Sequence, residues 1–224
     1  MGSVFITATG TEIGKTHISC AFLSRLQEQG RMPLPIKPLM SGFDEADLAS
    51  SDAGRLLKAC GRKVTSQEIA TICMKRFTAP LAPNVAARQV GQTLDYDDIL
   101  AFVNARMLGA DGPVLVEGAG GVMSPVTDEK LHVDLIRDLA MPTFLVTANY
   151  LGSVSHTLSA LEVLSRRAIP VLGVIVSQPT ADAPPPQPLI EELARWSDVR
   201  LLAADYRPSS DLTELADMMI QLAR

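Results

Sequence analysis

The stretch Gly10-Thr11-Glu12-Ile13-Gly14-Lys15-Thr16 follows an apolar segment at residues 3–8 and opens a helical pattern at residues 15–29. A strand, a glycine-containing loop and a helix in this order direct backbone N–H groups and the positive end of a helix dipole at one anion. Lys15 is then expected to reach the β- and γ-phosphates of a nucleotide, and the hydroxyl of Thr16 to hold Mg²⁺. The stretch predicts a phosphate-binding loop for ATP or GTP. It is a variant loop, because Thr9 stands where the usual pattern has its first glycine.

Length and composition are typical of one globular domain covering residues 1–224. The chain is 47% hydrophobic, which is enough to bury a sizeable core. Its net charge is −5 and its Lys and Arg residues form no run, so electrostatics give no support for a nucleic-acid partner.

The three cysteines form no C-x-x-C pair and have no histidines at metal-ligand spacing. They are expected to be buried thiols in a reducing compartment. The N-terminus lacks the pattern of a secretory leader, and Ile6 breaks the myristoylation pattern. No apolar run approaches the length of a membrane span. The expectation is a cytoplasmic protein without a membrane partner.

Apolar segments of strand length alternate with segments of helical periodicity. The predicted strands are residues 3–8, 33–38, 113–117, 142–148, 170–177 and 199–203. The predicted helices are residues 16–26, 46–60, 95–108, 130–139, 153–166, 189–196 and 210–222. Strands that are apolar throughout indicate a parallel sheet buried on both faces. The predicted fold is α/β, with a doubly wound, mostly parallel sheet and helices on both faces.

Ligands of such sheets bind at the carboxyl ends of the strands, where this chain places several polar side chains. Lys37 ends the second predicted strand and is either a lysine extending to solvent or a second cation beside the phosphates. Glu117 ends the third, where a carboxylate typically holds Mg²⁺, although a turn acid is the alternative. Asp52 reads as a helix-capping or first-turn acid.

Three further features carry less information. The glycine-rich turn at residues 118–121 allows close approach of a ligand, and its N–H groups could receive an anion. Residues 179–188 contain five prolines and predict an extended surface loop. His17, His132 and His156 are scattered, with no nucleophile motif beside them, so a hydrolytic triad is unsupported.

In order and spacing, the segments 7–16, 37–42, 51–53 and 117–121 resemble the dethiobiotin synthetase family of P-loop proteins. Further likeness lies in residues 79–87 and 151–158. The resemblance implies a ligase that uses ATP and Mg²⁺ to join CO₂ to a diamine, 7,8-diaminononanoate, and closes the cyclic urea of dethiobiotin. It also implies a cytoplasmic homodimer with the substrate site at the subunit interface.

The resemblance assigns roles to individual residues. Lys37 and Lys15 would be catalytic, and Thr16, Asp52 and Glu117 would bind the metal. The nucleotide would contact Glu12, Ile13, Gly14, Lys15, Thr16, His17, Glu117, Ser177 and Gln178. The substrate would contact Thr11, Lys37, Ser41 and Gly118, and its carboxylate tail would meet Leu151, Gly152, Ser153 and Ser155 of the neighbouring subunit.

The chain also departs from the family pattern. Ala8 and Gly10 replace the usual glycine and aspartate of the loop, and Ser155 replaces an asparagine. Ser177 and Gln178 stand where the family offers an asparagine to adenine, and the base loop is unrecognisable in residues 202–205. How the protein holds the base is therefore less well predicted than how it holds the phosphates.

Two other classes compete with the ligase. A partitioning or membrane-positioning ATPase shares this kind of loop, but it carries a signature lysine where this chain has Gly10 and an aspartate where it has Glu117. An amidoligase of related fold would need a source of ammonia, and the sequence shows no glutaminase domain or nucleophilic cysteine motif to supply it.

Overall fold

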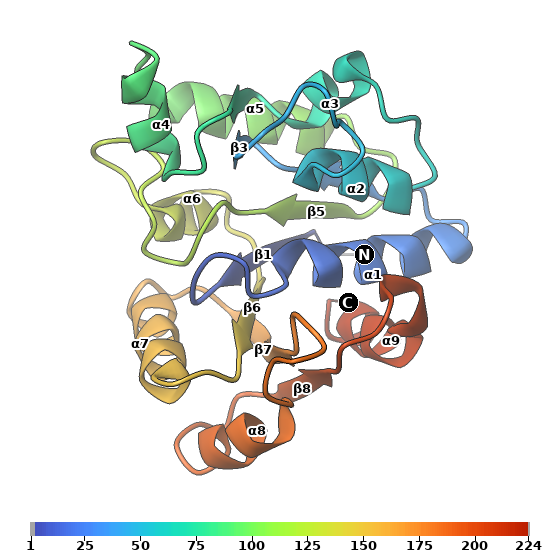
Figure 1. Ribbon diagram of the computed structural model, residues 1–224, viewed down its shortest axis with the longest axis vertical. Coiled ribbons are helices and arrows are strands. Elements are labelled where there is room, and N and C mark those ends of the chain that lie inside the picture. Colours follow the sequence, from blue (N-terminus) through green and yellow to red (C-terminus); the bar gives the residue numbers. More distant parts are fainter. Residues whose placement is uncertain (1–2, 224) are drawn as a thin grey trace.

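A six-stranded parallel sheet forms the centre of the molecule (Figure 1). The computed structural model describes residues 3–223. The strands are β1 (Val4–Ala8), β2 (Leu34–Ile36), β5 (Val114–Glu117), β6 (Thr143–Ala148), β7 (Val171–Ser177) and β8 (Leu201–Ala204). Their order is β2-β5-β1-β6-β7-β8, and each neighbouring pair is parallel. Because the order reverses on the two sides of β1, this is the predicted doubly wound sheet.

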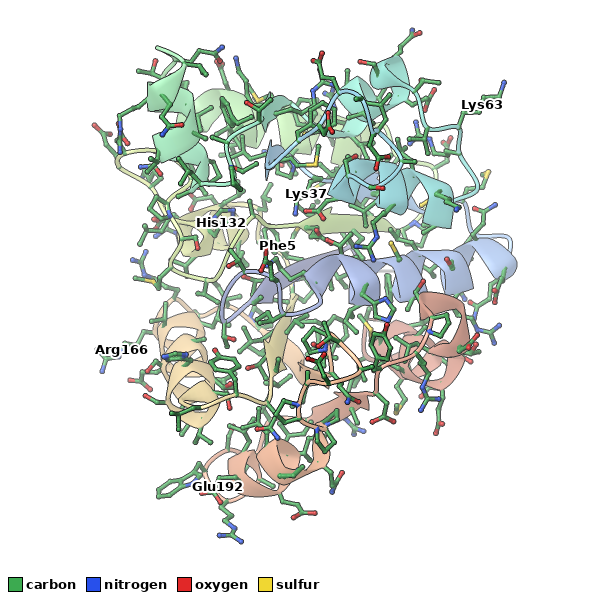
Figure 2. All side chains as sticks on the ribbon, viewed as in Figure 1. Phe5, Lys37, Lys63, His132, Arg166 and Glu192 are labelled. Atoms are coloured by element: carbon green, nitrogen blue, oxygen red, sulfur yellow. The ribbon has the colours of Figure 1, made fainter. Side chains whose placement is uncertain are left out.

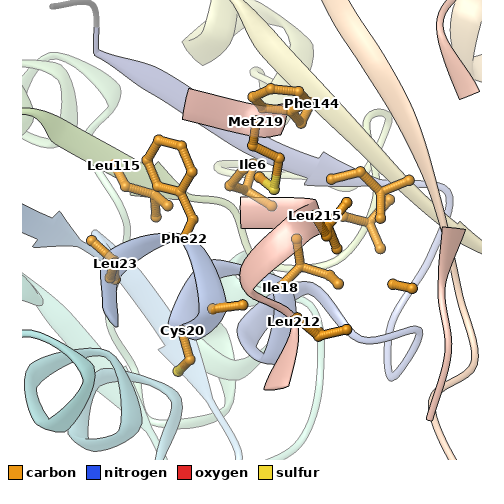
Figure 3. Close-up of a cluster of buried hydrophobic side chains, with 14 of the residues drawn as sticks. Ile6, Ile18, Cys20, Phe22, Leu23, Leu115, Phe144, Leu212, Leu215 and Met219 are labelled. Carbon is orange, nitrogen blue, oxygen red and sulfur yellow. The ribbon is translucent and has the colours of Figure 1, made fainter. Parts of the chain in front are cut away.

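Successive residues of each strand pack against opposite layers of helices. Ile6 of β1 packs with α1 (Lys15–Glu28), α2 (Asp52–Ala59) and α9 (Thr213–Leu222), a cluster drawn in Figure 3. Phe5, its neighbour in β1, belongs to the cluster on the other face. That face is covered by α5 (Tyr96–Leu108), α6 (His132–Asp138), α7 (Ser153–Arg166) and α8 (Gln187–Leu193). Burial on both faces explains why the strands are apolar throughout.

A smaller unit beside β2 was not predicted from the sequence. It contains the parallel pair β3 (Leu39–Ser41) and β4 (Lys75–Phe77), with α3 (Ser66–Ile72) and α4 (Pro83–Gln89). A short 3₁₀ turn, η1 (Ser209–Asp211), precedes α9. Lys37 lies between the end of β2 and the start of β3, so it connects the central sheet to this pair.

All six predicted strands are confirmed, but several predicted boundaries differ from those observed. The predicted helix at residues 46–60 begins only at Asp52, because Asp44 and Asp47 accept hydrogen bonds from Ala46 N–H and Ser50 N–H and hold this segment in turns. The predicted proline-rich loop is shorter than 179–188, since α8 begins at Gln187.

The three cysteines are buried, as predicted. Burial raises the pKa of Cys20, Cys60 and Cys73 to about 12 in each case. Within residues 3–223, no helix has both the length and the apolar character needed to cross a bilayer.

Candidate active site

A cleft of about 1250 Å³ opens at the carboxyl ends of the central strands. It brings together the phosphate loop, the ends of β2 and β3, the start of α2, the loop after β5 and the segment after β8. The predicted site residues that line it are Thr11, Glu12, Gly14, Lys15, Thr16, His17, Lys37, Ser41, Asp52 and Gln178. Its volume is sufficient for a nucleotide together with a second small substrate.

The phosphate loop has the conformation that its glycines predict. Gly14 is the N-cap of α1 with φ of 96°, in the left-handed region that glycine adopts without strain. Glu12 also lies in that region, with φ of 56°, which is uncommon for a residue with a side chain. The Lys15 ammonium donates to the carbonyl of Gly10 across the loop, at 2.9 Å. Gly14, Lys15 and Thr16 line the cleft, so the N-terminus of α1 faces it.

The three predicted metal ligands meet below this helix terminus. The Thr16 hydroxyl oxygen lies 2.9 Å from Asp52 Oδ1 and 2.8 Å from Glu117 Oε1. Ser51, whose hydroxyl accepts from Gly54 N–H, caps α2 and makes Asp52 its first residue. Glu117 comes from the end of β5 and is fully buried.

The residues fit a hard cation. The three predicted ligands offer carboxylate and hydroxyl oxygens, the donors that Mg²⁺ prefers. Glu117 Oε2 is buried and has no hydrogen-bond partner among the described residues, so this oxygen retains coordinating capacity. No cluster of three His, Cys, Asp or Glu side chains suited to a metal occurs within residues 3–223.

Lys37 does not extend to solvent, so the first sequence interpretation of this residue was wrong. Its side chain is 3% exposed, and its ammonium lies 2.7 Å from Glu117 Oε1 and 2.8 Å from Asp52 Oδ2. Burial alone disfavours the charged ammonium, but the two carboxylates outweigh it and raise the pKa of Lys37. Lys37 is therefore a cation held at the centre of the acidic cluster.

The pKa of Lys15 is shifted in the opposite direction to that of Lys37. Burial, together with repulsion from Lys37, lowers the pKa of Lys15 to about 8. Two ammonium groups thus share one side of the cleft, where the triphosphate of a nucleotide would supply the missing negative charge. His17 lines the same cleft. Its pKa is lowered mainly by burial and, to a smaller extent, by the positive charge of the nearby Arg55.

Three predicted nucleotide contacts are engaged within the protein. Ile13 packs into the core beside α1. Ser177 is buried and its hydroxyl donates to the carbonyl of Ile13 at 2.5 Å. The amide of Gln178 donates to the carbonyl of Ala183 and accepts from the N–H of Tyr206.

The glycine-rich turn after β5 is also largely satisfied internally. Gly118 N–H donates to the carbonyl of Ile6, Ala119 N–H to a ring nitrogen of His132, and Gly121 N–H to the hydroxyl of Ser124. These three amides are not available to an anion in this structure, so the prediction that N–H groups of the turn could receive an anion does not hold for them. His132 is a participant that the sequence analysis missed, since its partner lies 13 residues away in the chain.

The predicted contacts to the substrate tail lie outside the cleft of this chain. Leu151, Gly152, Ser153 and Ser155 form the loop and first turn at the start of α7, and none of them lines the cleft. Leu151 is fully exposed. Their predicted role requires a second subunit.

The doubly wound sheet, the phosphate loop and the lysine–carboxylate cluster define a P-loop protein of the class that binds nucleoside triphosphates. A family model described as an AAA domain matches residues 2–208. Solved structures share the fold: cell-division ATPase MinD of Pyrococcus furiosus has a TM-score of 0.54 at 13% identity, with full coverage of both chains. A chain of the MinC:MinD cell division protein complex of Aquifex aeolicus has a TM-score of 0.56 at 10% identity, covering 99% of this chain and 88% of the other.

Curated relatives narrow the class. The chain is 39% identical to the ATP-dependent dethiobiotin synthetase BioD of Caulobacter vibrioides, over 98% of this chain and 100% of the relative. It is 41% identical to BioD of Caulobacter sp. strain K31, over 98% and 95% of the two chains. The chain belongs to the dethiobiotin synthetase family, a family of ligases.

Proposed function

We propose that this enzyme uses ATP and Mg²⁺ to join CO₂ to 7,8-diaminononanoate and to close the ring of dethiobiotin. In this proposal the enzyme is a cytoplasmic homodimer, and each subunit is one P-loop ligase domain that covers residues 1–224. The curated relatives, named ATP-dependent dethiobiotin synthetases, support the overall reaction. The observation in this chain that best supports the proposal is the position of Lys37. Its ammonium is buried near Lys15, in a cleft that Thr11 and Ser41 also line.

The proposed reaction has three steps. One amine of the substrate attacks CO₂ and loses a proton, which gives a carbamate. A carbamate oxygen then attacks the γ-phosphorus of ATP, ADP leaves, and a carbamic–phosphoric anhydride forms. The second amine attacks the carbonyl carbon, phosphate leaves and a proton is lost, which closes the cyclic urea.

The protein would contribute position and charge. In phosphoryl transfer, catalysis is mostly positioning and stabilisation of the developing negative charge. Lys15 would hold the β- and γ-phosphates, and Lys37 would contact the carbamate and the transferred phosphoryl group. The hydroxyl of Ser41 is buried without a hydrogen-bond partner among the described residues, so it is available to the substrate.

Mg²⁺, when bound by Thr16, Asp52 and Glu117, supplies positive charge to the phosphate oxygens. Lys37 contacts both of these carboxylates in the present structure. It would have to exchange one of these contacts for the carbamate once substrate binds.

A direct assay tests this function. The protein is incubated with the diamine, bicarbonate, Mg²⁺ and ATP, and dethiobiotin and phosphate are quantified. Equal amounts of the two products are expected. A folded protein that binds nucleotide but forms no dethiobiotin would overturn the proposal.

A further inference from the structure

His132 is a buried histidine with both ring nitrogens engaged by backbone groups. It is 2% exposed and is the first residue of α6. Nε2 accepts a hydrogen bond from Ala119 N–H at 3.0 Å, and Nδ1 lies 2.9 Å from the carbonyl oxygen of Ser124. A carbonyl can only accept and a backbone N–H can only donate, so the proton is on Nδ1 and the lone pair on Nε2. The partners thereby fix one neutral tautomer.

The N–H that His132 receives belongs to the same peptide group as the carbonyl of Gly118. That carbonyl accepts a hydrogen bond from the Lys37 ammonium at 3.1 Å. Because a peptide group is planar, its N–H and C=O turn together. His132 and Lys37 therefore hold opposite ends of one rigid unit, and rotation of this unit would remove a partner from each.

The packing leaves this unit little freedom. A side chain built on Gly118 would place its Cβ 3.1 Å from His132 Cδ2 and 3.1 Å from Phe5 Cε1. The imidazole and the Phe5 ring thus lie close against the Gly118 backbone, and Figure 2 labels Phe5, Lys37 and His132 in the same central region of the molecule. Lys37 itself is 2% exposed, and its ammonium is held by the carbonyl of Gly118 together with the two carboxylates.

We propose that His132 is a positioning residue of the ligase, which orients the Gly118–Ala119 peptide and through it the ammonium of Lys37. The inference rests on the proposed role of Lys37 in the reaction. His132 contacts neither nucleotide nor substrate in this assignment, so its effect is on kcat and not on nucleotide binding.

Two substitutions separate positioning from simple packing. His132→Gln keeps an acceptor oxygen that can reach Ala119 N–H, whereas His132→Leu fills the space without one. Leu164→Ala, a fully buried position on α7, is the control for loss of stability alone. The dissociation constant for ATP, kcat, and the urea midpoint are measured for each.

We expect kcat to fall about 10- to 100-fold in His132→Leu, the size of effect that misplacement of a catalytic group produces. His132→Gln should recover most of this loss, and nucleotide affinity should change by less than about threefold in both. Leu164→Ala should lose stability while keeping kcat. A folded His132→Leu protein with parental kcat would overturn the proposal, as would equal losses of kcat in the Gln and Leu variants.

A second measurement is independent of catalysis. Nitrogen-15 NMR should show His132 protonated at Nδ1, and exchange of the Ala119 amide should be at least about tenfold faster in His132→Leu than in His132→Gln. The Lys37 ammonium resonance should shift in the Leu variant only. If the parent protein forms no dethiobiotin, the proposed function fails, and these signals still decide whether His132 orients the peptide. Unchanged Ala119 and Lys37 signals in the Leu variant would refute it.

Discussion

At the scale of single residues, the cleft depends on one buried cation that serves two carboxylates. Removing one member of a buried ion pair typically costs about 3–5 kcal/mol, because the remaining charge is left without compensation. Lys37 lies within 2.8 Å of both Asp52 and Glu117. The same contacts that suit it for charge stabilisation therefore also couple it to the folding of the site.

Lys37→Ala should lower kcat by orders of magnitude and leave nucleotide binding nearly intact, since this cation acts mainly on charge that develops during the reaction. The measurement is steady-state formation of dethiobiotin, together with a binding titration with ATP. Lys63→Ala, at an exposed lysine away from the cleft, is the matched control (Figure 2). Equal turnover in Lys37→Ala and parent would contradict the role of Lys37.

The buried imidazole of His132 predicts a pH dependence of stability. Burial, with a smaller contribution from Lys37 and Lys15, lowers its pKa from 6.5 to about 4. The unfolded chain therefore takes up a proton below pH 6.5 that the folded protein does not bind until about pH 4.

The free energy of unfolding should consequently fall with decreasing pH across this window, by about 1.4 kcal/mol per pH unit from this group. His132→Gln should lack that part of the slope, and groups common to both proteins cancel in the difference. Urea unfolding of the two proteins from pH 7.5 to 4.5 provides the test. Parallel curves would show that His132 titrates normally in the fold.

At the scale of elements, a close backbone contact of α2 positions Asp52, which is one of the proposed metal ligands. A Cβ built on Gly54 would lie 2.0 Å from the carbonyl oxygen of Leu48. The hydroxyl of Ser51 donates to the same carbonyl, at 2.7 Å. The first turn of α2, which contains Asp52, thus packs directly against the backbone of the turn at Leu48.

Gly54→Ala should therefore push α2 away from that turn and carry Asp52 away from Thr16. We expect a loss of stability of about 1–3 kcal/mol, and a higher Mg²⁺ concentration for half-maximal activity. Gly10→Ala is the control for stability, because a Cβ there meets nothing within 4 Å. Urea unfolding and a Mg²⁺ titration measure the two effects. A Gly54→Ala protein with parental stability and Mg²⁺ dependence would contradict this account.

The elements that could be predicted are those with a strong pattern. The six sheet strands are continuous apolar segments because helices cover both faces. The strands β3 and β4 were missed since each has three residues and β4 begins with Lys75 and Arg76. The helix α4 has no side-chain cap at Ala82 and begins with Pro83. Local pattern is too weak in such elements, and tertiary contacts decide them.

The site was predictable where a residue type and a strand end coincide, as for Lys37 and Glu117. Asp52 gave only a capping signal from its own sequence, because its approach to Thr16 depends on how α2 packs beside α1. The same applies to His132, whose function lies in a contact with a distant amide. Long-range contacts of this kind leave no periodic trace in the sequence.

At the scale of the whole molecule, the start of α7 is where the proposed homodimer would bring a second subunit. Leu151 is fully exposed. The exposed loop precedes a helix N-terminus, which suits a carboxylate through its N–H groups and dipole. In the proposed homodimer this terminus would receive the tail of a substrate bound in the neighbouring cleft.

Subunit mixing tests this arrangement. Lys37→Ala disables the cleft, and Ser155→Glu places a like charge beside the carboxylate tail at an exposed position. Each variant alone should be nearly inactive. Random exchange in a 1:1 mixture should restore about a quarter of the parental sites, because half of the dimers are mixed and each has one intact site. A mixture of exchanging dimers that stays inactive would place the tail site within one chain.

The three buried cysteines have a practical consequence for following such a dimer in solution. Maleimide dyes react with the thiolate, and thiols with a pKa near 12 supply almost none at neutral pH. A single cysteine introduced at Lys63, an exposed position away from the cleft, would then be the preferred attachment point on an otherwise unreactive chain. Energy transfer between donor- and acceptor-labelled chains would report association and subunit exchange.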